Sequence, residues 1–235
     1  MLKTLWEKIE TAERRVRRSF GKDISTPAAR ALSALHYNLF DHAWLRSLWT
    51  NFWQIAPGVW RSNHPTHRRF EKYAAMGIRT VITLRGEEKY SHYLFEKESC
   101  EKLGLTLLHA KLWARTAPSR VRIANLISVM REAERPFMFH CKSGADRAGF
   151  ASAVYLMVFE NVPVEVARKQ LGLKYVHLEF TRTGIQGYVL DMYAARNAEA
   201  PIPFETWAAT EYDEKAAQAG FDSRRPPADV AKELA

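Results

Sequence analysis

One stretch decides the fold of this chain: Pro136-Phe137-Met138-Phe139-His140-Cys141-Lys142-Ser143-Gly144-Ala145-Asp146-Arg147-Ala148-Gly149. It begins with a short apolar run, and a second apolar run of helix length, residues 150–159, follows it. This order predicts a strand, a tight loop and a helix N-terminus. Backbone N–H groups and the positive end of a helix dipole meet at such a loop, so the loop favours a bound tetrahedral anion.

Two side chains of this loop add chemistry to the predicted anion site. Cys141 stands at its start, and Arg147 follows six positions later. A helix N-terminus and a nearby cation lower the pKa of a thiol from its free value of about 8.5, so Cys141 can be a thiolate nucleophile. A guanidinium can bind two phosphoryl oxygens at once. The alternative, a cysteine buried at a strand end for packing alone, does not require the arginine or the glycines.

The Cys-x5-Arg pattern, with His140 before the cysteine and Gly149 after the Arg-Ala pair, resembles the signature of the cysteine-dependent protein tyrosine and dual-specificity phosphatases. Residues 59–65 and 80–87 are similar to the first strands of the small bacterial members of that superfamily. In all, the resemblance covers roughly residues 56–196. It implies hydrolysis of phosphate monoesters through a phosphocysteine intermediate, with no metal and no other cofactor.

The resemblance also implies roles for single residues. Cys141 is the expected nucleophile, Arg147 the clamp for the phosphoryl oxygens, and His140 the residue that holds the loop by hydrogen bonds. The further residues expected to bind substrate are Lys142, Ser143, Gly144, Ala145, Ala148 and Gly149 of the loop, and Lys111 and Arg115 of the segment expected to overhang it. For the lysines and for Arg115, a solvated basic rim is the alternative interpretation.

The general acid is the first departure from the pattern of the superfamily. Most members carry an aspartate on an upstream loop that corresponds here to residues 111–118, and this segment contains no carboxylate. We therefore expect Asp146 to be the general acid, since an Asp-Arg pair at this place also resembles the loops of the myotubularin and Sac lipid phosphatases. The alternatives are that Asp146 only pairs with a loop cation such as Lys142 or with backbone N–H groups, or that His109 is the acid.

The second departure is Ala148, which stands where the superfamily usually has Ser or Thr. That hydroxyl helps the thiolate to leave when the phosphocysteine breaks down. Its absence predicts slow turnover, and it leaves open a phosphate-binding protein that has lost catalysis. The other cysteine, Cys100, lies in a predicted helix, so we expect an isolated thiol rather than a disulfide with Cys141.

The hydrophobic pattern around the loop predicts an α/β domain with a mostly parallel central sheet flanked by helices. The predicted strands are residues 59–62, 78–84, 105–109 and 136–140, and the predicted helices are residues 66–76, 90–103, 119–134, 148–159, 164–171 and 184–196. Sheets of this kind bind ligands at the carboxyl ends of their strands. The Cys-x5-Arg loop lies at such an end.

The chain is expected to divide into three parts. Residues 1–55 form a helical, basic and aromatic extension, residues 56–197 the catalytic domain, and residues 198–235 a partly ordered tail that contains four prolines. Within the extension, residues 2–20 have the spacing of a basic amphipathic helix, which either lies on an anionic membrane or packs on the domain. Residues 28–53 are rich in aromatic rings and are expected to cover one side of the domain in helical form.

Composition limits the partners and the compartment. Against 26 Asp and Glu the chain has 35 Lys and Arg, a formal net charge of +9, which favours anionic partners. No nucleic-acid-binding motif accompanies this charge, so we expect a phosphorylated protein, or a phosphorylated lipid or inositol, as substrate. Only two cysteines are present, no apolar run is long enough to span a membrane, and no secretory signal is evident. These features favour a cytoplasmic location, with peripheral membrane association as a further possibility.

Overall fold

A five-stranded sheet forms the centre of the computed structural model, which describes residues 11, 13, 15–16 and 19–235. The strands are β1 (Trp53–Ala56), β2 (Val59–Ser62), β3 (Thr80–Thr83), β4 (Thr106–His109) and β5 (Phe137–His140), in the spatial order β1-β2-β5-β3-β4. Strands β2, β5, β3 and β4 run parallel, and β1 pairs antiparallel with β2 at the edge. The expected mostly parallel sheet is confirmed. The edge strand β1 is an addition, because the sequence interpretation placed Trp53 at the end of a helical segment.

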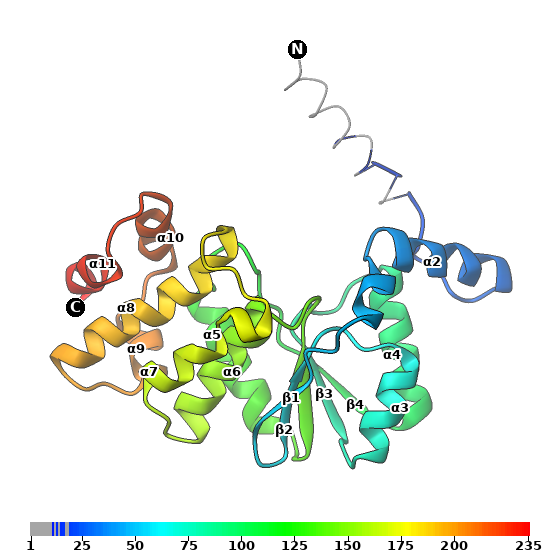
Figure 1. Ribbon diagram of the computed structural model, residues 1–235, viewed down its shortest axis with the longest axis horizontal. Helices are drawn as coiled ribbons and strands as arrows, with labels where there is room; N and C mark the ends of the chain where they lie inside the picture. Colours follow the sequence, from blue (N-terminus) through cyan, green and yellow to red (C-terminus); the bar gives the residue numbers. More distant parts are fainter. Residues whose placement is uncertain (1–10, 12, 14, 17–18) are drawn as a thin grey trace.

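The central strand β5 brings the loop of interest to the middle of one sheet edge. All four of its residues are buried, as expected for a strand covered on both faces. Its last residue, His140, is in register with Ser62 of β2 and with Thr83 of β3. Because these parallel strands end at the same level, the segments that follow them meet at one edge of the sheet (Figure 1).

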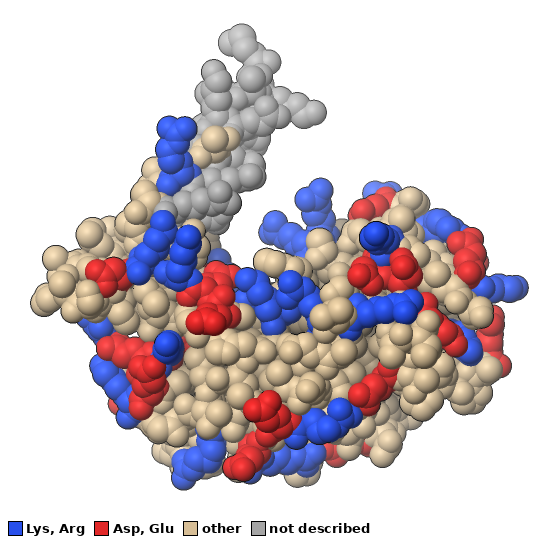
Figure 2. All heavy atoms as spheres, turned by 180° about the vertical axis from the view of Figure 1, so that it is seen from behind, with Lys and Arg blue, Asp and Glu red and all other residues tan. Residues whose placement is uncertain are grey.

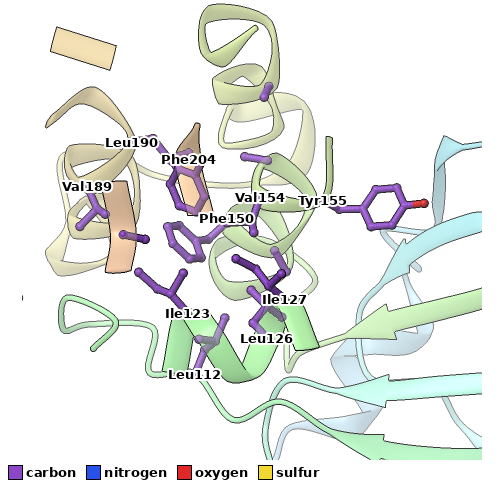
Figure 3. Packing of buried hydrophobic residues seen from close by; sticks show 14 of the residues in the cluster. Leu112, Ile123, Leu126, Ile127, Phe150, Val154, Tyr155, Val189, Leu190 and Phe204 are labelled. Atoms are coloured by element: carbon purple, nitrogen blue, oxygen red, sulfur yellow. The ribbon is translucent and has the colours of Figure 1, made fainter. Parts of the chain in front are cut away.

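Helices cover both faces of the sheet (Figure 1). The helices of the catalytic part are α3 (His67–Ala75), α4 (Ser91–Leu103), α5 (Arg120–Glu132), α6 (Asp146–Phe159), α7 (Val164–Ala167) and α8 (Ile185–Glu199). Short 3-10 turns follow or precede them at η2 (Arg168–Gln170), η3 (Leu173–Tyr175) and η4 (Arg182–Gly184). Helices α3 and α4 enclose a smaller apolar cluster that includes Phe70 and Cys100. On the other face, Phe150 of α6 lies among side chains of α5 and α8 (Figure 3).

The C-terminal segment differs from the expectation of a partly ordered tail. Residues 198–235 form helices α9 (Phe204–Thr210), α10 (Glu214–Asp222) and α11 (Pro227–Leu234). Trp207, Tyr212 and Val230 are buried in the same apolar cluster as Phe150. The prolines that suggested disorder instead mark helix starts, since Pro226 precedes α11 and proline fits the first turn of a helix.

The N-terminal extension packs on the side of α4. Its helix α2 (Pro27–Leu39) begins at Thr26, whose hydroxyl accepts a hydrogen bond from the Ala29 N–H at 3.2 Å. The buried ring of His36 lies with Nδ1 2.8 Å from Ser91 Oγ. A 3-10 turn, η1 (Ala43–Ser47), then leads toward the sheet edge. The amphipathic helix expected over residues 2–20 falls largely outside the described residues. Within the described part of the chain, no helix is long and apolar enough to cross a membrane.

Candidate active site

The loop between β5 and α6 is pressed against the end of β2. Cys141, buried, follows the strand directly, and the helix begins at Asp146. Gly144 has a φ of +74°, and a Cβ atom built on it would lie 2.7 Å from the backbone nitrogen of Asn63 and 2.8 Å from the carbonyl carbon of Ser62. Any side chain here would push the loop away from the sheet, so glycine is required at this position.

A fully buried arginine supports the loop from below. Arg61, in the middle of β2, donates hydrogen bonds from Nη2 to the carbonyl oxygens of Gly144 at 2.6 Å and of Ala145 at 3.1 Å. In a trans peptide the carbonyl and the N–H point in opposite directions, so the N–H groups of Ala145 and Asp146 point away from Arg61. Burial lowers the pKa of Arg61 to about 10, while the charges of Cys141 and other neighbours partly offset this effect.

His140 belongs to a buried polar network behind the loop. Its Nδ1 lies 3.3 Å from the carbonyl oxygen of Cys141, and its Nε2 bonds to the buried carboxylate of Glu96. Both ring nitrogens thus face acceptors, so the pair is either an imidazolium with a carboxylate or a neutral imidazole with a carboxylic acid. The His64 ring packs edge-on at 4.9 Å, and burial together with Arg85 holds the pKa of His64 well below its ordinary value.

Ligand atoms of His64, Glu96 and His140 all lie within 4.8 Å of one another, which is the spacing of a metal site. However, His140 and Glu96 already bond to each other, and Arg85 Nη1 lies 3.5 Å from Nδ1 of His64. A guanidinium beside one ligand opposes a bound cation. The charges therefore favour a hydrogen-bond network over a metal centre.

A cavity of about 400 Å³ lies above the loop. Its lining includes Lys142, Ser143, Asp146 and Arg147 of the loop, Ala114 and Arg115 of the overhanging segment, His42, Leu45, Arg46 and Trp49 of the extension, and Thr183. The structure thus brings Arg115 to the loop as expected. Lys111 is not part of this lining, because its Nζ lies 3.2 Å from Glu88 Oε1 and its side chain covers the ring of Trp113.

Arg147 carries an unsatisfied donor within this site. Its Nε is buried and has no hydrogen-bond partner in the described part of the chain. Burial lowers the pKa of Arg147, and the neighbouring Cys141 opposes this shift. A buried N–H without a partner costs about 1–3 kcal/mol. The Arg147 side chain also lines the cavity, so an anion bound there can meet its guanidinium.

Asp146 has a partner that sequence reasoning missed. Its Oδ1 lies 2.7 Å from Nδ1 of His177, whose side chain is fully buried. Lys142, the loop cation considered as a partner of Asp146, has its Nζ 3.8 Å from an oxygen of Asp41. His109, the second candidate acid, contacts the Tyr93 hydroxyl at 3.0 Å and lines a different cavity.

The N-terminal extension contributes a buried ion cluster to the cavity wall. Asp41 accepts two hydrogen bonds from Arg85, at 2.6 and 3.0 Å, and one from Arg46 at 2.7 Å. Burial raises the pKa of Asp41. Arg85 and then Arg46 oppose this effect and together outweigh it, so the pKa of Asp41 lies well below its ordinary value. Asp41 therefore stays ionised near neutral pH and cannot donate a proton. It orients cations, including Lys142, at the edge of the cavity.

Three further hydrogen bonds join the extension to the loop and to the segments beside it. Asn51 Nδ2 donates to the carbonyl oxygen of Tyr175 at 2.8 Å and to that of Ser143 at 3.3 Å. Asn63, directly after β2, donates from Nδ2 to the carbonyl oxygen of Trp49 at 2.6 Å. The segment from Trp49 to Asn51 is therefore built onto the Cys-x5-Arg loop, and the extension is part of the site.

Residues 111–118, where the superfamily carries its acid, are fixed from the C-terminal side. Gln186 of α8 donates from Nε2 to the carbonyl oxygens of Trp113 at 3.0 Å and of Thr116 at 3.1 Å. The N–H of Ala117 donates to Gln218 Oε1 of α10 at 2.9 Å. These bonds hold the segment over the cavity without placing a carboxylate there.

The settings of Ala148 and of Cys100 are clear from the structure. Ala148 is fully buried in the larger apolar cluster. Cys100 is free and lies in the smaller cluster between the sheet and α4, whereas Cys141 belongs to the larger cluster. Burial, with help from Glu96, raises the pKa of Cys100. Cys100 is therefore an unreactive thiol, and it lies on the opposite face of the sheet from the apolar cluster that contains Cys141.

A family model described as PTP-SAK, Swiss Army Knife protein, DSP-PTPase phosphatase domain, matches residues 53–183. The chain belongs to this family. The DSP-PTPase domain begins at the edge strand β1 and ends within η4, so it includes the Cys-x5-Arg loop and His177 but leaves out α2, η1 and the helices from α8 onward. The recognition of a cysteine-dependent, dual-specificity phosphatase from the sequence is confirmed.

Several solved structures are similar to this DSP-PTPase chain. TpbA of P. aeruginosa is 17% identical, with a TM-score of 0.47 over 62% of this chain and 91% of that one. Tk-PTP in its active form is 22% identical, with a TM-score of 0.48 over 60% of this chain and 97% of that one. PTPMT1 in complex with PI(5)P is 17% identical, with a TM-score of 0.46 over 62% and 97%. No curated protein matches the sequence.

Proposed function

We propose that this protein hydrolyses phosphate monoesters through a phosphocysteine on Cys141, without a metal. The observation that carries the proposal is the guanidinium of Arg147, which lines the cavity above the Cys-x5-Arg loop and whose Nε has no hydrogen-bond partner among the described residues. The N–H groups of Ala145 and Asp146 point away from Arg61, and an anion of phosphate geometry can bind to them. A reducing compartment such as the cytoplasm suits this chemistry, because the nucleophilic thiolate has to stay reduced.

Each residue has a defined task in the proposed reaction. The Cys141 thiolate attacks phosphorus, and Arg147 with the loop N–H groups stabilises the equatorial oxygens. Asp146 protonates the leaving oxygen, and in the second step it accepts a proton from the water that hydrolyses the phosphocysteine. Because Ala148 offers no hydroxyl to the departing thiolate, this second step is expected to be the slow one.

The first proposed substrate class is a phosphorylated protein, of the phosphotyrosine or dual-specificity type. Trp49 and His42 stand at the cavity wall, and flat rings there can contact the ring of a phosphotyrosine. Lys142, Arg115 and Arg147 supply the positive charge that a phosphate requires. Figure 2 shows Lys and Arg side chains along the hollow between the extension and the C-terminal helices.

A second candidate is a phospholipid or inositol phosphate at a membrane surface. Large apolar side chains are exposed beside the cavity-lining segments: Leu48 is 77% exposed next to Trp49, and Phe180 is 87% exposed three residues before Thr183. Apolar side chains around a basic centre are typical of proteins that bind anionic lipid surfaces. The same arrangement can serve a protein partner, so the test compares both substrates.

The experiment measures phosphate release by wild type and by Cys141→Ser from an aryl phosphate, a phosphotyrosine peptide, and vesicles that carry a phosphoinositide. We expect turnover by wild type, unchanged by chelator, and none by Cys141→Ser. Acid quench is expected to trap a phosphate-labelled wild-type chain. Faster turnover of the vesicles than of the peptide would support the lipid candidate. A folded wild-type protein that binds phosphate but hydrolyses none of the three would instead be a phosphate-binding pseudophosphatase.

A further inference from the structure

The ring of His177 lies next to the carboxyl group of Asp146. His177 Nδ1 lies 2.7 Å from Asp146 Oδ1, and the other ring nitrogen, Nε2, is buried without a hydrogen-bond partner in the described part of the chain. Asp146 itself is partly exposed and lines the cavity above the loop. The imidazole therefore stands behind the carboxyl group, on the side away from the cavity.

The backbone that presents His177 is strained and fixed from several sides. Val176 has a φ of +62°, a conformation that a β-branched residue rarely adopts. Such strain costs on the order of 1–3 kcal/mol and persists only where the surroundings enforce it. Here the His177 N–H donates to the carbonyl oxygen of Gly172 at 3.2 Å, and Asn51 holds the carbonyl oxygen of Tyr175. These hydrogen bonds hold the strained segment in place, with the His177 ring directed at Asp146.

The unpartnered nitrogen decides which tautomer is present. A buried N–H donor without an acceptor is costly, whereas a ring nitrogen that merely lacks a donor costs less. The neutral imidazole with its proton on Nδ1 avoids an orphaned N–H at Nε2. In this tautomer His177 donates its hydrogen bond to Asp146 Oδ1. That oxygen then acts as an acceptor, so a proton carried by Asp146 has to reside on Oδ2.

We propose that His177 is a positioning residue for the general acid: by donating to Oδ1 of Asp146 it places the acidic proton on Oδ2, toward the bound ester. This inference rests on the proposed phosphatase function. In the first step the S–P bond forms, the P–O bond to the leaving group breaks, and the Oδ2 proton passes to the leaving oxygen. In the second step water forms the new P–O bond, its proton returns to Oδ2, and the S–P bond breaks.

The test depends on the leaving group. An aryl phosphate with a good leaving group needs no acid, whereas an alkyl phosphate does. We expect His177→Leu, which removes the donor, to lower kcat for the alkyl ester by roughly 10- to 100-fold, a part of the roughly 10²- to 10⁴-fold that acid–base catalysis contributes. For the aryl ester we expect a change of less than about threefold, since the acid contributes little there. Asp146→Asn is expected to show the same selectivity, and adding His177→Leu to it should cost little more.

Conservative variants separate positioning from folding. His177→Asn can place an amide N–H where Nδ1 lies and is expected to keep most alkyl activity, whereas His177→Gln places its amide near the Nε2 position and is not. If His177→Leu does not fold, the comparison of His177→Asn with His177→Gln provides the test. His109→Leu, a histidine outside the site, is the matched control and should leave both esters unchanged.

Three results would overturn the proposal. One is an equal loss on aryl and alkyl esters in His177→Leu, which would indicate a structural role. Another is equal activity of His177→Asn and His177→Gln on the alkyl ester. The third is a wild type without any Cys141-dependent turnover, which refutes the phosphatase function itself and this inference with it. The Cys141→Ser comparison distinguishes that last case from the first two.

Discussion

Replacing Asp41 by asparagine tests whether the buried ion cluster that joins the N-terminal extension to the catalytic part stabilises the fold. Asp41 is the acidic member of a buried cluster in which Arg85 binds both of its carboxylate oxygens and Arg46 binds one. The side chains of Asp41, Arg46 and Arg85 are 7%, 3% and 10% exposed, so water screens these ion pairs little. The substitution keeps the shape of the side chain and removes its charge.

The expected loss of stability is large. At the observed distances each pair attracts with several kcal/mol at an effective dielectric constant of about 20, although desolvation offsets most of this gain. Removing the carboxylate charge, however, leaves the guanidinium groups of Arg46 and Arg85 buried without compensation. Breaking a buried pair in this way costs about 3–5 kcal/mol. Asp41→Asn is therefore expected to lower the free energy of unfolding by that amount.

The same cluster predicts a pH dependence. The pKa of Asp41 in the folded chain lies well below the ordinary value of 3.8, so the unfolded chain takes up this proton first. The stabilisation is complete above pH about 5 and is lost as the pH falls through 3.8 and below. Asp41→Asn lacks this contribution, so its stability should fall less steeply than that of wild type below pH about 4.

Urea unfolding at pH 7, at pH 4 and at pH about 2.5, followed by tryptophan fluorescence, measures both effects. Glu205→Gln is the matched control, because it breaks the exposed pair with Arg131, whose distance is 3.0 Å. Its expected cost is at most about 1 kcal/mol. If Asp41→Asn cost no more than Glu205→Gln and kept the acid slope of wild type, the assignment of Asp41 as counterion of the cavity wall would be wrong.

Three further predictions concern other parts of the molecule. A small thiol-alkylating reagent is expected to label Cys141 and to spare Cys100, whose pKa burial raises; peptide mapping after brief exposure decides this, and equal labelling would contradict it. Trp207→Ala is expected to lower the free energy of unfolding by about 3–5 kcal/mol in urea titrations, because Trp207 is 2% exposed in the core; a loss below 1 kcal/mol would mean that α9 does not belong to it. Ala148→Ser is expected to shorten the lifetime of the acid-trapped phosphocysteine, and an unchanged lifetime would show that the missing hydroxyl does not limit turnover.

The parallel sheet and the loop could be predicted because their signals are local. Four runs of strand length are each followed by a helical pattern. This alternation is enough to predict the order of strands and helices along the chain. The strand β1 gave no such signal, since only Ala56 of its four residues is buried and its ladder ends in an irregular register. The C-terminal helices were missed because Pro203 and Pro226 suggested disorder, although both stand directly before helices.

The contacts of the site residues could not be predicted from the sequence, for a different reason. Asp146 meets His177 across 31 residues, and Arg85 meets Asp41 across 44, so only the tertiary fold sets these contacts. Arg61 is an exception, because a charged residue in the middle of the apolar strand 59–62 has to be paired if the strand is buried. That rule predicts a partner for Arg61, although it does not identify the loop carbonyls as that partner.

The family match and the geometry together locate what is particular to this chain. The matched segment, residues 53–183, contains the loop, Arg61 and His177, but it does not contain Asp41, Arg46 or Trp49. Arg46 and Trp49 line the cavity above the loop together with Arg115, and Asp41 binds Arg46 from outside this lining. The anion site therefore belongs to the family domain, whereas the surroundings of the leaving group depend on the extension. Because the phosphoryl group is the same in every monoester, the proposed phosphatase has to select its substrate through the other lining residues, which include Arg115 and Thr183 of the family domain and Arg46 and Trp49 of the extension.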